Sequence, residues 1–229
     1  MATLKFYMTP GSCSTGIHIL LEEVGLAFEA HLVNLLAGDH RKPEYLAINP
    51  RGTVPALALT DGVVLGEFQD IARWLADNDP RRKLTPASPE DQRRVRQVMD
   101  YAISVVHGEG FTRVFVSEGY ATGDRTKKQI EAEGRQIAMR GFERLESMIR
   151  GPGFVVESFS IADAALFYVE FWADHLGLTL PPKCLQHFQK MLLRPAVRQV
   201  LAEEGYAQTL LRHTGSIRPL LSRRAASPG

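Results

Sequence analysis

Features that define several other classes of protein are missing from this chain of 229 residues. Two cysteines are present, Cys13 and Cys184, and their low number and wide separation exclude a disulfide-stapled fold and suit a reducing compartment. No apolar run reaches the roughly 18 residues that a membrane span needs. The first residues lack the basic and long apolar regions of a signal peptide. We therefore expect a cytoplasmic protein that does not act in a membrane.

The chain also lacks a strong net charge and the common metal and nucleotide motifs. Its 27 Lys and Arg nearly balance its 26 Asp and Glu, so there is no overall basic field for nucleic acid. It contains no C-x-x-C, no H-E-x-x-H, no Cys/His cluster, no P-loop and no G-x-G-x-x-G. We therefore predict no metal site and no nucleic-acid partner.

The two parts of the chain differ in their hydrophobic pattern. Over residues 1–80, predicted strands at 4–8, 28–35, 56–59 and 63–65 alternate with helices at 14–24 and near 71–75, an order that predicts one α/β domain. Three prolines mark residues 79–89, so we place a linker at 81–89. Residues 90–229 are predicted to be all-helical, with helices at 90–117, 125–150, 160–176, about 183–192 and 195–204 and a tail at 212–229.

Cys13 is the first candidate catalytic residue. It follows a strand and a Pro10-Gly11 turn, and it stands at or just before a helix N-terminus. Unpaired backbone N–H groups and the helix dipole favour a thiolate there, and a thiolate is the nucleophilic form of cysteine. Ser12 and Ser14 flank it, and either hydroxyl could cap the helix or bond the sulfur. The competing interpretation is a small buried cysteine that only packs.

Three further positions are candidates, each with an ordinary structural alternative. Val54-Pro55 opens a strand after a tight loop, and a cis bond there would turn the Val54 N–H and C=O toward an extended ligand. Glu67 begins a helix, where a carboxylate gains from the dipole and could accept from a ligand ammonium. His107 lies within a predicted helix, where a lone histidine is more often a surface or packing residue.

Four segments together resemble the cytosolic glutathione transferase family. They are residues 9–14 (TPGSCS), 47–57 (AINPRGTVPAL), 66–77 (GEFQDIARWLAD) and 159–163 (FSIAD). The resemblance covers about residues 4–206 and implies a thioredoxin-like α/β N-terminal domain followed by an all-α helical domain. The fourth segment is similar to the family's helix-capping motif, and Ser160 with Asp163 fits a capping-box variant.

Within that family the chain is most similar to the bacterial beta class. The beta-class first loop reads Pro-Gly-Ala-Cys-Ser, and this chain has Pro-Gly-Ser-Cys-Ser over residues 10–14. Residues 104–107 with Phe111 resemble the beta-class segment whose histidine faces the active site. The resemblance implies that Cys13 lies nearest the glutathione sulfur, with Ser14 beside it and His107 approaching from the helical domain.

The same resemblance implies a set of glutathione-binding residues. Val54-Pro55 would present the Val54 backbone to the cysteinyl part of glutathione. Glu67 would hold the γ-glutamyl ammonium, and the backbone N–H of Phe68 its carboxylate. Phe68 departs from the Ser, Thr or Gly usual at this place. The beta-class lysine after the second strand has no direct match, and Lys42 and His40 are the nearest basic substitutes.

The implied reaction is attack of the glutathione thiolate on a hydrophobic electrophile held between the domains. Ser14, His107 or the helix dipole would stabilise the thiolate, and Cys13 could instead exchange through a mixed disulfide in a thiol-transferase or peroxidase reaction. The expected pocket residues are Tyr101, Ser104, His107, Phe111 and Phe115. A non-catalytic binding or regulatory module on the same fold is the alternative. The resemblance also implies a homodimer, with which opposite net charges of −5 over residues 1–80 and +6 over 81–229 are compatible.

Overall fold

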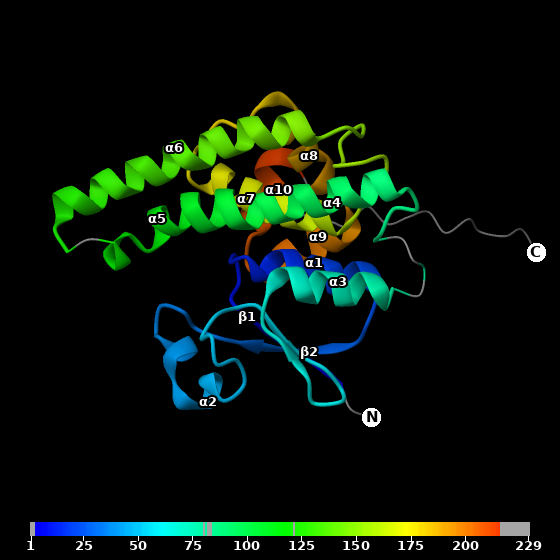
Figure 1. Ribbon diagram of the computed structural model, residues 1–229, viewed down its shortest axis with the longest axis horizontal. Coiled ribbons are helices and arrows are strands. Elements are labelled where there is room, and N and C mark those ends of the chain that lie inside the picture. Colours follow the sequence, from blue (N-terminus) through cyan, green and yellow to red (C-terminus); the bar gives the residue numbers. More distant parts are fainter. Residues whose placement is uncertain (1–2, 80, 82–83, 121, 216–229) are drawn as a thin grey trace, which may run out of the picture.

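The computed structural model describes residues 3–79, 81, 84–120 and 122–215. In chain order the elements are β1 (Leu4–Met8), α1 (Ser14–Val24), β2 (Phe28–Leu32), the short η1 (Asp39–Arg41), α2 (Pro43–Leu46), β3 (Ala56–Ala58), β4 (Val64–Leu65), α3 (Phe68–Asp77), α4 (Pro89–Tyr101), the wide-turn helix η2 (Ala102–Phe111), α5 (Thr112–Phe115), η3 (Ser117–Gly119), α6 (Asp124–Met148), α7 (Ile161–His175), α8 (Pro182–Met191), α9 (Pro195–Glu203) and α10 (Ala207–Thr214). A mixed sheet with its helices is followed by a helical bundle, which confirms the predicted fold class (Figure 1).

The sheet has four strands in the order β2-β1-β3-β4, with β1 parallel to β2 and antiparallel to β3. Along β1 the buried side chains Leu4, Phe6 and Met8 alternate with more exposed ones, so one face of the sheet is packed. Helices α1 and α3 lie between the sheet and the helical bundle (Figure 1). The loop between β1 and α1 therefore lies at the boundary between the two halves of the molecule.

Local signals in the N-terminal domain determine where its elements end. The apolar spacing that predicts α1 ends at Val24, and Gly25 follows with a φ of +74° and its N–H bonded to the Leu21 carbonyl, as expected for a C-terminal glycine. Strand β2 ends at Leu32 rather than at the predicted residue 35. Beyond it the Asn34 side chain accepts from the Ala37 N–H at 3.0 Å, which turns the chain out of the sheet.

Helix α7 forms the centre of the helical domain. Residues 161–173 are all buried, and α1, α4 and α8 pack against the helix. Its start confirms the predicted capping box, because the Ser160 N–H donates to Asp163 at 2.7 Å and the Ser160 side chain caps the first turn. Asp163 also accepts from the Val155 N–H at 2.7 Å, so the preceding loop is fixed to the helix start.

The remaining helices differ in part from the prediction. The single helix expected at 90–117 is three consecutive elements, α4, η2 and α5, because the turns widen over residues 102–111. Helix α10 was not predicted, and residues 212–214 of the expected tail belong to it, whereas 216–229 lie outside the described residues. Of the expected linker, Leu84 is buried and its carbonyl accepts from the Ile161 N–H at 3.3 Å. Within the described ranges, no helix combines the length and apolar character needed to cross a membrane.

Candidate active site

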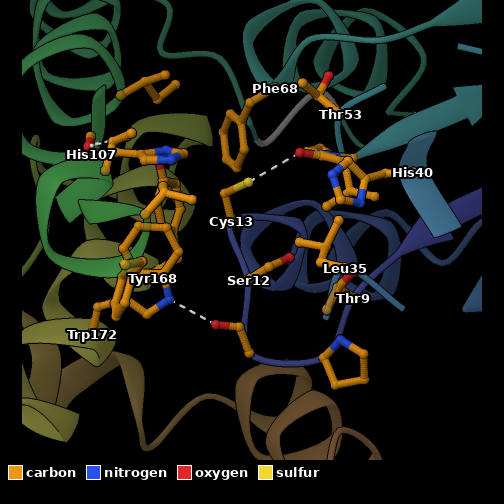
Figure 2. A pocket seen from close by; sticks show the side chains of 18 of the residues that line it. Thr9, Ser12, Cys13, Leu35, His40, Thr53, Phe68, His107, Tyr168 and Trp172 are labelled. Carbon is orange, nitrogen blue, oxygen red and sulfur yellow. Dashed lines mark hydrogen bonds between the residues drawn. The ribbon is translucent and has the colours of Figure 1, made fainter. Parts of the chain in front are cut away.

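A cavity of about 700 Å³ opens between the N-terminal domain and the helical bundle. Three loops line one side, at residues 9–13, 52–55 and 66–68, and η2, α5 and α7 line the other. Figure 2 shows Cys13 in the middle, with His107, Tyr168 and Trp172 facing it from the helical side. The cavity thus brings together residues of both domains, as expected from the sequence.

Cys13 lies at the N-terminus of α1 and contributes to the cavity lining. Its thiol donates to the Val54 carbonyl oxygen, with 3.2 Å between Sγ and O (Figure 2). Burial raises the pKa of Cys13 to about 12, and the nearby Glu67 charge adds to this, while hydrogen bonds from the backbone of Cys13 and Ser14 lower it by less. Desolvation therefore opposes the thiolate that the helix N-terminus favours, and a thiolate at Cys13 stays a prediction.

Ser14 is not among the residues that line the cavity, and its predicted place beside the glutathione sulfur stays a prediction. Its side chain is fully buried in the turn before α1, where Oγ accepts from the Thr9 N–H at 3.1 Å and donates to the Thr9 carbonyl at 2.9 Å. These bonds hold the loop closed, and the Ser14 hydroxyl also lies 2.7 Å from the Ser12 Oγ. Ser12 lines the cavity instead, and its hydrogen bond lowers the pKa of Cys13 slightly.

The Val54–Pro55 peptide bond is cis, and both residues line the cavity. The carbonyl of the preceding Thr53 accepts from the Tyr45 hydroxyl at 2.6 Å and from the Asn49 side-chain amide at 2.8 Å. These two bonds fix the loop from behind, so that Val54 presents its backbone on the cavity side. The sequence had identified this bend but not the two side chains that support it.

Glu67 and Phe68 lie where the hairpin meets α3, at the edge of the cavity. The Glu67 carboxylate forms an ion pair with the Arg51 guanidinium. Phe68 opens α3, so its backbone N–H has no acceptor within the helix, while its ring is buried against Tyr168 with 5.4 Å between centroids. Phe68, which stands where the family usually has Ser, Thr or Gly, thus packs its ring between the two domains.

Lys42 does not line the cavity, contrary to the expectation. It is exposed and forms an ion pair with Asp39, with 2.6 Å between Nζ and Oδ1. The other basic substitute, His40, does line the cavity, and Figure 2 shows it across from Cys13. The His40 Nδ1 atom is buried without a hydrogen-bond partner among the residues that the structure describes. Because the chain turns at η1, His40 faces the cavity whereas Lys42, two residues later, faces solvent.

His107 lines the cavity from η2, as the sequence predicted. Its Nδ1 lies 3.1 Å from the Tyr168 hydroxyl, and its ring stands edge-on to Trp172 with 4.9 Å between centroids. Burial lowers the pKa of His107 to about 4, because the charged form loses its hydration. The imidazole is therefore neutral at neutral pH and acts as a hydrogen-bonding group rather than as a cation.

Wide turns in η2 change which residues face the cavity. In a π-helix hydrogen bonds join residues five apart, so one face repeats every four or five residues instead of every three or four. The lining residues from this stretch are Ile103, His107, Thr112, Phe115 and Val116. The expected Phe111 is fully buried, and Tyr101 and Ser104 line a separate groove between α4 and α6. A helical spacing of 3.6 residues per turn predicted correctly that His107 lines the cavity. It wrongly predicted the same for Tyr101, Ser104 and Phe111.

Comparison with known proteins identifies the family. The profile described as glutathione S-transferase, N-terminal domain, matches residues 11–78, and the corresponding C-terminal domain profile matches residues 128–202. Glutathione S-transferase GstA of Escherichia coli O157:H7 is 34% identical over 88% of this chain and 99% of its own length. The chain belongs to the glutathione S-transferase family.

Solved structures of other family members have the same fold. A glutathione transferase homologue from Sulfitobacter, solved with bound glutathione, superposes with a TM-score of 0.82 at 31% identity, over 89% of this chain and 99% of that one. The bacterial beta-class glutathione S-transferase of Sphingomonas chungbukensis superposes with a TM-score of 0.74 at 28% identity, over 88% and 99%. The structural relatives of this glutathione S-transferase family member thus include beta-class proteins.

An aromatic wall on the helical side of the cavity was missed in the sequence apart from Phe115. Tyr168, Phe171 and Trp172 come from α7, and Phe115 and Tyr206 extend the wall from α5 and from the turn before α10. In the sequence the α7 residues have the spacing of a packed helix, and most of α7 is indeed core. Spacing alone does not separate the face of a buried helix that borders a cavity from the faces that meet other helices.

A group of possible metal ligands lies apart from the cavity in this family member. His18 and Glu22 on α1 and Glu203 on α9 each place one donor atom within 4.8 Å of the others. His18 is already hydrogen-bonded, with Nδ1 at 2.9 Å from Glu204 and Nε2 at 3.5 Å from Glu203. Burial and the Glu203 charge raise the pKa of Glu22. The hydrogen bond and ion pair of His18 explain why these side chains lie together: they join α1 of the N-terminal domain to the end of α9 in the helical domain.

Proposed function

We propose that this protein catalyses the conjugation of glutathione with an apolar electrophile. The observation that carries the proposal is the two-sided cavity. Its N-terminal side offers peptide groups and a carboxylate, which suit a charged tripeptide, and its helical side offers aromatic rings, which suit an apolar molecule. The glutathione bound to the Sulfitobacter homologue supports the first half of this assignment.

Glutathione would lie extended along the N-terminal side of the cavity. Its cysteinyl backbone would pair with the backbone of Val54, next to Pro55, in the manner of an added strand. Its γ-glutamyl ammonium would bind Glu67 in place of the Arg51 guanidinium, and its γ-glutamyl carboxylate the N–H of Phe68 at the start of α3. His40 replaces Lys42 as our candidate for the glycyl carboxylate, since it lines the cavity and its Nδ1 has no hydrogen-bond partner among the described residues.

The chemical step forms a bond between the glutathione sulfur and a carbon of the electrophile. The thiol first loses its proton to solvent, and the sulfur then supplies the electron pair of the new bond while the leaving group departs with its own. Ser12 and the N-terminus of α1 stabilise the negative sulfur. Cys13 lies beside it as a neutral thiol rather than as the nucleophile, and would leave the Val54 carbonyl to donate its hydrogen bond to the sulfur. Neutral His107 completes the helical side of the site.

A thiol-transferase or peroxidase reaction through Cys13 is the second candidate, and the local chemistry disfavours it. Disulfide exchange begins with a thiolate, and burial raises the pKa of Cys13. Cys184 is fully buried in the helical domain and far along the chain, so it is poorly placed to resolve a mixed disulfide. We therefore assign the conjugation reaction to the site.

The test measures glutathione binding by titration calorimetry and turnover with a chlorodinitrobenzene as the chromogenic electrophile. The informative variant is E67Q, which keeps the shape of the side chain and removes its charge. R73Q, which alters an exposed arginine of α3 that pairs with Asp70 and Asp100, is the control. Binding and turnover in the wild type, both lost in E67Q only, support the proposal. Binding without turnover would identify a binding module, and absence of binding would overturn the proposal.

We further propose that the protein is a cytoplasmic homodimer built from two domains, residues 1–80 and 90–229, joined at 81–89. The opposite net charges of the two parts, −5 and +6, favour contact between unlike domains of two copies. The two unpaired cysteines suit a reducing compartment. Sedimentation velocity at low and high salt tests the assembly: a mass of one chain at both salt concentrations would contradict it.

A further inference from the structure

The two backbone groups of Gly11 are both held by side chains of the helical domain. The Gly11 N–H donates to Glu204 Oε2 at 2.8 Å, and the Gly11 carbonyl accepts from the indole N–H of Trp172 at 2.7 Å. Figure 2 shows the second bond below Cys13. These partners lie 193 and 161 residues away in the chain, so the loop that carries Cys13 is fixed from outside its own domain.

Glu204 is a buried carboxylate whose other hydrogen bonds go to the start of α1, next to Gly11. Oε2 also accepts from the Thr15 hydroxyl at 2.7 Å, and Oε1 lies 2.9 Å from His18 Nδ1. Thr15 and His18 belong to the first turns of α1, directly after Cys13. One carboxylate therefore joins the end of α9 both to the loop before α1 and to the start of that helix. Charge-assisted bonds of this kind are stronger than neutral ones.

The side chains around Gly11 pack closely against it. Its φ of +73° is in the left-handed region that favours glycine. A Cβ atom at this position would lie 2.0 Å from the Tyr206 hydroxyl oxygen, so the ring of Tyr206 covers the glycine directly. Tyr206 follows Glu204 in the turn before α10, and the two residues hold Gly11 together.

Trp172 connects this loop to the aromatic side of the cavity. Its ring stands edge-on to His107 and to Phe115, with centroid distances of 4.9 and 5.1 Å. The same indole lines the cavity and donates its N–H to Gly11. A single side chain thus contacts both the proposed electrophile space and the loop on the glutathione side.

We propose that Trp172 and Glu204 are positioning residues for the reaction. By holding the N–H and the carbonyl of Gly11 they fix the loop of residues 10–13, and thereby the distance between the glutathione sulfur and the electrophile. The inference rests on the proposed function, because the sulfur belongs to glutathione. The hydrogen bonds of Trp172 and Glu204 go to Gly11 and not to Val54 or Glu67, the groups that would hold glutathione at its far end. An effect on the position of the sulfur can therefore be measured separately from an effect on glutathione binding.

The experiment compares W172F and E204Q with two neighbouring controls, W74F and E203Q. W172F removes the indole N–H and keeps an aromatic ring, and E204Q removes the charge. Glu203 contacts the same His18 as Glu204 but not Gly11, and Trp74 lies on α3 away from the loop. Three quantities are measured on the full chain: kcat and KM for glutathione, the rate of Cys13 alkylation followed by peptide mass spectrometry, and the melting temperature.

Loss of one Gly11 bond should lower kcat about fivefold or more while KM for glutathione changes less than about twofold. Alkylation of Cys13 should become faster by a similar factor, because the loosened loop exposes the thiol. Both controls should match the wild type. A merely structural role would lower the melting temperature and leave kcat and the alkylation rate of the folded protein unchanged, which would overturn the proposal.

The two proposals fail in different ways. If the wild type neither binds glutathione nor turns over the electrophile, the proposed function is wrong. The alkylation rates still decide then whether Trp172 and Glu204 hold the Cys13 loop. If the wild type is active and W172F keeps the full kcat and the slow alkylation of Cys13, the positioning role is wrong and the function stands. W172F suffices for this decision if E204Q does not fold.

Discussion

Arg51 and Glu67 form an ion pair at the mouth of the cavity, and Glu67 is the carboxylate that we assign to the glutathione ammonium. The two side chains are 68% and 40% exposed, so solvent screens the pair and its contribution is about 0–1 kcal/mol. A ligand ammonium therefore has to displace only a weak partner. In the proposed complex, Arg51 would therefore compete with the glutathione ammonium for Glu67.

Replacing Arg51 with glutamine should strengthen glutathione binding by up to about fivefold at low salt, because the competing cation is removed. The gain should shrink as salt rises, since screening already weakens the ion pair. Titration calorimetry at two ionic strengths measures both effects, with R73Q as the control for the loss of one positive charge. Weaker binding in R51Q would show that Arg51 itself holds glutathione.

Cys13 should react slowly with iodoacetamide. Since burial raises its pKa to about 12, its alkylation at about pH 8 should be at least about 100-fold slower than that of free glutathione. The rate should rise about tenfold per pH unit from about pH 7 to about pH 10, because only the thiolate reacts. A rate that levels off below about pH 8 would demonstrate a thiolate and return Cys13 to the role of nucleophile.

His107 should make stability depend on pH on the acid side of neutrality. Its pKa is lowered from 6.5 to about 4 in the folded protein, so between these values the unfolded chain binds more protons. The stabilisation is complete above pH 6.5 and is lost as the pH falls toward 4, by up to about 3 kcal/mol. Urea unfolding of wild type and H107Q across this range should give curves that converge at the acid end. Curves with a constant separation would contradict the lowered pKa.

Asp163 should be among the most costly residues to alter outside the cavity. It is fully buried, accepts from two backbone N–H groups at 2.7 Å, and lies 3.1 Å from Nε2 of His187. Burial alone would lower the pKa of His187, but the Glu170 and Asp163 carboxylates outweigh it and raise the pKa to about 9. D163N removes the charge and should lower the free energy of unfolding by about 2–4 kcal/mol. D100N, at an exposed position, is the control, and equal losses in both variants would refute the special role of Asp163.

Much of the fold could be predicted because its signals are local. The apolar spacing and Gly25 define α1, and Ser160 with Asp163 defines the start of α7, as predicted. Several site positions were found in the same way, since Cys13 follows a turn at a helix start and Val54-Pro55 closes a constrained loop. Each of these patterns spans a few residues, and steric and hydrogen-bonding preferences over that span decide the conformation.

The errors concern quantities that depend on surroundings. Helix η2 packs against α6 and α7, and Tyr101 and Ser104 line a groove outside the cavity. Which of His40 and Lys42 faces the cavity depends on how η1 turns, and both are basic residues in one short segment. Composition and residue spacing carry no information about packing between residues that are distant in the sequence.

The sequence by itself determined the order of the four strands and of most helices, the change from an α/β to a helical part, and the presence of a cysteine at the start of α1. Only the tertiary structure decided the state of that cysteine and what holds it. Burial raises the pKa of Cys13, and side chains more than 150 residues away hold the neighbouring Gly11. The physical reason is that desolvation and cross-domain hydrogen bonds exist only after the chain has folded.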